Sequence, residues 1–212
     1  MQEAIMVRVW MADITPLLIE ETYQACYREL PEWRKEKADR QHHLIDRAQS
    51  VGAWSLWMRV RERYSLLDEV VYNLSHSGNY VLCAFSDTQG VKVGCDLEVA
   101  KDLREAVARR FFCQAEYEHL MQIEEPERTR RFFRYWVLKE SFLKATRRGM
   151  ALDTRSFEIG WDENDSPYLK NQPKEFPERY YYQEYHRANV DAGIAVCTTD
   201  PEIDEQLYLL EL

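Results

Sequence analysis

Three β-rich segments follow one another closely in the middle of the chain, and they limit the folds that are open to it. They cover residues 71–75, 80–86 and 91–98. The connections between them are short and contain Gly78 and Gly90, which tolerate a positive φ. Strands joined by such short turns pair antiparallel, so the pattern predicts two consecutive β-hairpins.

Helical patterns lie on both sides of these strands. We expect helices at residues 15–30, 32–63, 103–112, 114–122 and 130–146, and further strands at residues 5–10, 156–161, 179–186 and 192–198. This order predicts an α+β fold with antiparallel sheets. We expect two lobes, residues 1–100 and residues 101–212, that meet near residue 100.

Composition narrows the class of protein. The 212 residues carry a net charge of −9 and are 45% hydrophobic, which is typical of a globular protein and argues against general nucleic-acid binding. The apolar runs are shorter than the ~18 residues of a membrane span, and the first residues contain the acid Glu3 and no long apolar segment of the kind that a signal peptide has. We therefore expect a cytoplasmic protein. Its five scattered cysteines suggest buried thiols, with neither a zinc cluster nor a disulfide framework.

Basic residues are concentrated in one segment. Residues 128–148 hold eight Lys or Arg side chains and a single acid, Glu140. Like charges one helical turn apart repel each other, so this segment favours an anionic ligand or partner nearby. A second basic cluster, in residues 34–47, is interleaved with acids, and a solvated helix face explains it.

Two short patterns bring together side chains that bind cations and phosphates. In the predicted strand 91–98, Asp96 and Glu98 share one face, while Cys95 and Leu97 face the core. Paired carboxylates suit Mg²⁺, although two solvated acids on a surface strand would look the same. In the predicted turn, Ser75-His76-Ser77-Gly78 offers hydroxyls, an imidazole and free N–H groups to a phosphate, or holds a structural histidine.

A third pattern lies on the predicted helix 130–146. Trp136, Glu140 and Lys144 are spaced by four residues and share a face. They form either an ordinary Glu–Lys helix pair or a third carboxylate with an ammonium group for a phosphate. Lys139 points about 100° away, and we expect it at the surface or in contact with a partner. Together the three patterns predict a cation-held diphosphate site.

These residues resemble the surfactin-type 4′-phosphopantetheinyl transferases. The likeness spans about residues 31–150 and rests on Tyr72–Gly78, Val93–Glu98, Arg110–Phe112 with Glu116, and Trp136–Lys144. It implies the fold of that family, with two similar α/β lobes, small antiparallel sheets and an active site between the lobes of a monomer. It also implies transfer of the phosphopantetheine arm of coenzyme A to a serine of an acidic acyl or peptidyl carrier protein.

The resemblance also implies site residues. Asp96, Glu98 and Glu140 would bind Mg²⁺ or Mn²⁺, and Glu140 would also be a candidate base for the serine, directly or through a metal-bound water. Lys144 would contact the bridging phosphate of coenzyme A, and Ser75 and His76 its other phosphate oxygens.

Further positions follow from the same likeness. Arg34, Lys37, Arg40 and Ser50 would surround the 3′-phosphate of coenzyme A, and Glu116 would lie near the site without a defined role. One departure is visible: the family's Gly-Lys-Pro or Gly-Arg-Pro element is missing from residues 63–71. This leaves open a non-catalytic relative that binds coenzyme A or carrier proteins. A metal-dependent nuclease is a further alternative, which the net charge disfavours.

Overall fold

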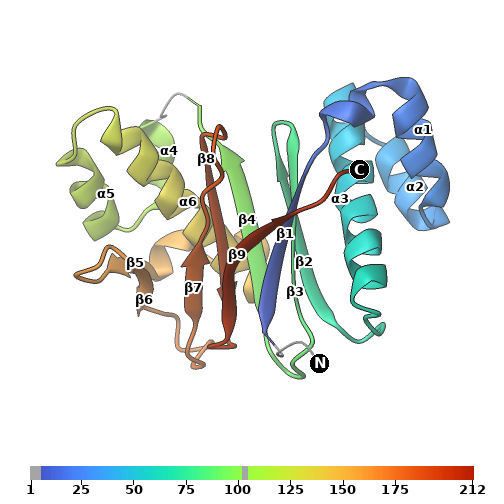
Figure 1. The fold of residues 1–212 in the computed structure, drawn as a ribbon. Helices are drawn as coiled ribbons and strands as arrows, with labels where there is room; N and C mark the ends of the chain where they lie inside the picture. Colours follow the sequence, from blue (N-terminus) through green and yellow to red (C-terminus); the bar gives the residue numbers. More distant parts are fainter. Residues whose placement is uncertain (1–5, 102–104) are drawn as a thin grey trace.

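The computed structural model describes residues 6–101 and 105–212, in which the strands lie between two groups of helices (Figure 1). The strands are β1 (Val7–Asp13), β2 (Val71–Ser77), β3 (Tyr80–Ser86), β4 (Val93–Val99), β5 (Glu158–Trp161), β6 (Pro167–Asn171), β7 (Tyr181–Glu184), β8 (Ala192–Thr198) and β9 (Ile203–Leu209). The helices are α1 (Glu20–Glu29), α2 (Glu32–Asp39), α3 (Leu44–Arg63), α4 (Glu105–Phe111), α5 (Gln114–Met121) and α6 (Glu127–Ala145), with 3₁₀ turns at Thr15–Leu18, Gly149–Ala151 and Thr154–Ser156. The α+β prediction is confirmed.

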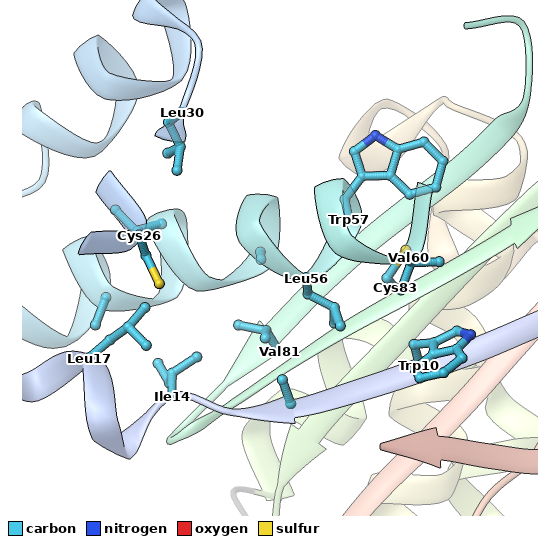
Figure 2. Close-up of a cluster of buried hydrophobic side chains, with 14 of the residues drawn as sticks. Trp10, Ile14, Leu17, Cys26, Leu30, Leu56, Trp57, Val60, Val81 and Cys83 are labelled. Carbon is cyan, nitrogen blue, oxygen red and sulfur yellow. The ribbon is translucent and has the colours of Figure 1, made fainter. Parts of the chain in front are cut away.

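The first sheet has the strand order β2-β3-β1-β9 and is covered by α3. Its core contains Trp10 from β1, Leu56 and Trp57 from α3, and Cys83 from β3, all of them buried (Figure 2). The first predicted hairpin is confirmed, because β2 and β3 pair antiparallel around Gly78, whose φ is +54°.

The second predicted hairpin is wrong. β4 does not pair with β3; it joins a three-stranded sheet of order β4-β8-β7. The reason is that β2 and β1 already occupy both edges of β3, which leaves no backbone groups for a further strand. The division of the chain at residue 100 remains a prediction, and β4 and β9 each pair with strands from the other side of it.

Two of the helical predictions change in the structure. The expected helix 32–63 is divided into α2 and α3, which places Ala38 and Ala48 in the same core. A continuous helix would hold these two residues about 15 Å apart along its axis. The expected helix 15–30 begins as a 3₁₀ turn before α1. In the described residues no helix is both long and apolar enough to span a membrane.

Helix α6 lies directly against the backbone of β4. A Cβ atom built on Gly94 would lie 2.1 Å from the carbonyl oxygen of Ser141 and 2.3 Å from the amide nitrogen of Ala145. At this point the strand and the helix are therefore in contact through main-chain atoms alone. The contact fixes the height of Glu140 and Lys144, on the same helix, above β4.

Replacing Gly94 by alanine is expected to lower the free energy of unfolding by about 3 kcal/mol, the upper end of overpacking costs, because backbone cannot move aside as a side chain does. Chemical denaturation followed by circular dichroism measures this. Gly90→Ala is the matched control, since φ at Gly90 is +78° and nothing lies within 4 Å of its added Cβ. Strain from a positive φ applies to Gly90 and not to Gly94, so a loss in Gly94→Ala no larger than in Gly90→Ala would contradict a tight contact with α6.

Candidate active site

Strand β2 is connected to strand β4 by hydrogen bonds to the side chains of β2. The side-chain oxygen of Asn73 accepts a hydrogen bond from the Cys95 N–H (2.9 Å), and the Ser77 hydroxyl accepts one from the Val99 N–H (3.1 Å). Contacts follow in the same chain order on both strands, so β2 and β4 run parallel. The two sheets are thus connected here by polar side chains of β2.

The same face of β2 holds the two carboxylates of β4. Ser75 donates a hydrogen bond to Asp96 Oδ1 (2.8 Å), and Ser77 donates one to Glu98 Oε2 (2.7 Å). The prediction that Asp96 and Glu98 share a face agrees with these contacts, and Cys95 and Leu97 are buried, as expected.

Lys144 connects helix α6 to Ser75 on β2 and to Asp96 on β4. Its Nζ atom donates to Asp96 Oδ1 (2.7 Å), Ser75 Oγ (2.8 Å) and the Cys95 carbonyl (3.1 Å). Burial acts to lower the pKa of Lys144, but Asp96 outweighs it and holds the pKa above its ordinary value. The lysine is therefore a fixed cation at the junction of β2, β4 and α6.

Glu140 lies one helical turn before Lys144 and is half-buried. Burial, followed by repulsion from Asp96, raises its pKa, and Glu98 adds to the same effect. The pKa of Glu98 is raised as well, mainly by burial and also by Asp96, although its bond from Ser77 opposes this. The three acids are close enough to act on one another.

One feature of the three acids Asp96, Glu98 and Glu140 is suited to a divalent cation. Asp96 is only 4% exposed, and its Oδ2 atom is buried without a hydrogen-bond partner. Carboxylate oxygens are the ligands that Mg²⁺ prefers. In residues 6–101 and 105–212, however, no three His, Cys, Asp or Glu side chains lie close enough together to hold a metal ion. Joint ligation by Asp96, Glu98 and Glu140 remains a prediction.

A pocket of about 590 Å³ opens between α2, α3 and β2. Four of the predicted phosphate-binding residues line it: Arg34, Lys37, Ser50 and His76. Arg40 does not; it is exposed and pairs with Glu36 at 3.6 Å. The other lining residues are Trp33, Gln41, Asp46, Gln49, Ala53, Trp54, Tyr72, Asn73, Leu74 and Arg147.

The pocket is cationic. Burial lowers the pKa of the Arg34 guanidinium, and desolvation followed by repulsion from Arg34 lowers the pKa of Lys37. Desolvation, then the charges of Lys144 and Lys37, also lowers the pKa of His76. Asp46 is the one acid among the lining residues. Cations that depress one another's pKa favour an anionic ligand.

The free positive charge of residues 128–148 is smaller than the sequence alone indicates, because most of these cations are paired within the chain. Arg131 and Arg134 contact Asp165, and Arg134 also binds Glu184 at 2.7 Å. These acids come from segments distant in sequence, so the local charge count overstated the free positive charge. Arg147 is an exception: it is exposed and lines the pocket.

Lys139 was expected at the surface, and this prediction is wrong. It is 2% exposed, and its Nζ atom lies 2.8 Å from both carboxylate oxygens of Glu116. Glu116 also accepts hydrogen bonds from the backbone N–H groups of Cys113 (2.9 Å) and Ile159 (2.8 Å). The structure therefore gives Glu116 a structural environment that ties α5, α6 and β5 together.

The part of the chain that holds Asp96, Glu98, Glu140 and Lys144 is similar to known proteins. Residues 92–198, half of the chain, match the family model of the 4′-phosphopantetheinyl transferase superfamily. The chain belongs to this superfamily. The matched region contains β4 with Asp96 and Glu98 and α6 with Glu140 and Lys144. The resemblance inferred from the four motifs is confirmed.

Individual relatives carry the same description. The 4′-phosphopantetheinyl transferase Sfp of Bacillus subtilis (strain 168) is 32% identical over 146 residues, 68% of this chain and 62% of Sfp. The 4′-phosphopantetheinyl transferase HetI of Nostoc sp. is 45% identical over 107 residues, 49% of this chain and 44% of HetI. The matched stretch thus spans less than two thirds of these relatives.

One solved structure gives a partial likeness. The holo-[acyl-carrier-protein] synthase (AcpS) of Neisseria meningitidis has a TM-score of 0.44 and 21% identity to this chain, and the match covers 50% of this chain and 95% of that one.

Proposed function

We propose that the chain transfers the 4′-phosphopantetheine arm of coenzyme A to a serine of an acyl or peptidyl carrier protein, as a Mg²⁺-dependent, cytoplasmic, monomeric enzyme. The observation that carries the proposal is the meeting of Lys144, Ser75 and Asp96 beside a cation-lined pocket. Membership of the superfamily and the names of Sfp and HetI support it.

The donor would be held by the pocket and by Lys144. Arg34, Lys37 and Arg147 supply positive charge for phosphate oxygens, and His76, which also lines the pocket, is near enough to Lys144 for the lysine charge to lower its pKa. Lys144 already makes three hydrogen bonds at the junction, so its ammonium is oriented before a ligand arrives. An ammonium has three N–H groups, so a direct hydrogen bond to phosphate would replace one of these three, while the fixed charge stabilises the leaving phosphate electrostatically.

The reaction exchanges one phosphorus–oxygen bond for another. The serine oxygen of the carrier bonds to the phosphorus that bears the pantetheine arm, and the bond from that phosphorus to the bridging oxygen breaks. 3′,5′-Adenosine bisphosphate leaves with the electron pair, and the serine proton passes to the Glu140 carboxylate. Asp96, Glu98 and Glu140 would hold Mg²⁺, and the bound ion would supply positive charge against the diphosphate.

Mass spectrometry of an apo carrier protein tests the proposal. Carrier incubated with the protein, Mg²⁺ and coenzyme A should gain the mass of one phosphopantetheine group. An established transferase run in parallel confirms that each carrier is competent. Failure to modify any of a panel of competent carriers would contradict the proposal, and tight coenzyme A binding without transfer would favour the non-catalytic alternative.

Transfer should depend on pH through Glu140. A base must be ionised, and the pKa of Glu140 lies above its ordinary 4.5, mainly through burial. Because Mg²⁺ bound to Glu140 would lower this pKa, the rate at limiting Mg²⁺ should fall, as the pH is lowered, at a higher pH than an ordinary glutamate would give, and saturating Mg²⁺ should move this fall to lower pH. Single-turnover rates between pH 4.5 and 8 measure this. Glu140→Gln should be slow throughout and lack this acidic limb, and melting temperatures over the same range exclude unfolding as the cause.

A further inference from the structure

Trp33 has an unusual position for a tryptophan. It lies at the start of α2, lines the pocket and is 55% exposed. Its ring meets Trp54 edge to face, with ring centroids 4.8 Å apart. The guanidinium of Arg34 lies over both indoles, 4.8 Å from the Trp54 ring and 5.4 Å from the Trp33 ring. The pocket therefore has an aromatic rim held in place by a buried cation.

Unpartnered polar atoms lie behind this rim. Arg34 Nε, Ser50 Oγ and Trp54 Nε1 are buried and have no hydrogen-bond partner within the protein. Arg34 and Ser50 are each more than nine-tenths buried as residues. Buried donors without acceptors are costly, and three in one pocket point to a ligand that brings several acceptor atoms.

The aromatic rim and the unpartnered donors together indicate the chemical class of ligand that the pocket would bind. An exposed indole offers a flat face that attracts other planar rings, whereas Arg34, Lys37 and Arg147 favour phosphate oxygens. A purine nucleotide has both a planar ring with acceptor nitrogens and phosphate groups. The segment between α3 and β2, where the sequence lacks the family's Gly-Lys-Pro element, contributes no residue to the lining of this pocket.

We propose that Trp33 is the base-stacking residue of this chain: the purine of the donor nucleotide stacks on the Trp33 indole while its phosphates contact Arg34 and Lys37. This rests on the proposed function, because it assigns one end of the proposed donor to this pocket. Recognition of the base then comes from α2 and α3, and the missing element between α3 and β2 is not needed for it.

Binding of 3′,5′-adenosine bisphosphate, measured by isothermal titration calorimetry, tests the assignment without catalysis. Trp33→Ala should raise its dissociation constant about tenfold, a typical effect of removing an aromatic stacking partner. Trp33→Phe, which keeps a planar ring, should stay within about threefold of the wild type. Tyr168→Ala, on β6, removes an exposed aromatic side chain outside this pocket and should change nothing.

Inorganic pyrophosphate separates stacking from charge. It has phosphates and no base, so its affinity should be equal in the wild type and in Trp33→Ala. An equal loss of affinity for pyrophosphate and for the bisphosphate would mean that Trp33 acts only through Arg34, and this would overturn the assignment. Folding of each variant is checked by circular dichroism.

Other outcomes distinguish the two proposals. If Trp33→Ala binds the bisphosphate as tightly as the wild type while the wild type modifies carriers, the stacking role is wrong and the proposed function stands. If the wild type binds neither the bisphosphate nor coenzyme A, both are wrong.

Discussion

Replacing Asp96 by asparagine is expected to slow carrier modification at least 100-fold. Asparagine keeps the shape of the side chain but removes the charge that meets Lys144 at 2.7 Å. It also exchanges the buried, unpartnered Oδ2 atom, the best candidate for a cation ligand, for an atom of a neutral amide. Loss of a group at a metal site commonly reduces activity to this extent. The initial rate of carrier mass gain measures the effect.

Two further measurements test whether the loss of rate is specific to Asp96. Asp87→Asn changes an exposed aspartate in the turn before β4 and should leave the rate unchanged. Binding of Mn²⁺ to Asp96→Asn, followed by electron paramagnetic resonance, should be weaker than to the wild type. A variant that transfers at the wild-type rate and binds Mn²⁺ normally would remove Asp96 from the site.

Lys139→Met should lower the free energy of unfolding by about 3–5 kcal/mol, the usual cost of removing one partner of a buried ion pair. The substitution keeps the apolar volume but leaves the Glu116 carboxylate, 1% exposed, without a counter-charge. Urea denaturation measures the loss. Lys170→Met is the control, because Lys170 pairs with Glu158 with half of its side chain exposed, and surface pairs contribute about 1 kcal/mol or less.

The double variant Glu116→Gln, Lys139→Met tests the cause of that loss. With both charges removed, most of the lost stability should return, since the cost comes from an uncompensated buried charge. The backbone N–H groups of Cys113 and Ile159 keep an acceptor in the glutamine side-chain oxygen. A double variant as unstable as Lys139→Met alone would assign the loss to packing instead.

Local patterns predicted the elements that carry the candidate site. Alternation along a strand put Asp96 and Glu98 on one face, and helical spacing put Glu140 and Lys144 on another. The structure adds what joins them: Gly94 allows α6 to reach the backbone of β4, and Lys144 meets Asp96 there. The spacing of residues within one helix or strand cannot predict this contact, because it joins two segments nearly fifty residues apart in sequence.

The errors have the same origin. Lys139 looked like a surface residue because its partner, Glu116, lies on a different helix. β4 looked like the third strand of a meander because the sequence does not show that β1 takes the open edge of β3. β9 was not expected, since Asp204, Glu205 and Gln206 interrupt its apolar residues, yet parallel pairing with β1 orders it. Each outcome was decided by tertiary partners.

The polar connection between β2 and β4 has a consequence for how this protein tolerates change. The hydroxyls that orient the two carboxylates also link neighbouring sheets, since Ser77 contacts both Glu98 and the Val99 N–H. A substitution of such a residue that changes the chemistry of the site would also weaken the connection between the two sheets. Substitutions that leave the fold stable are therefore easier at the rim of the pocket between α2, α3 and β2 than among these residues of β2.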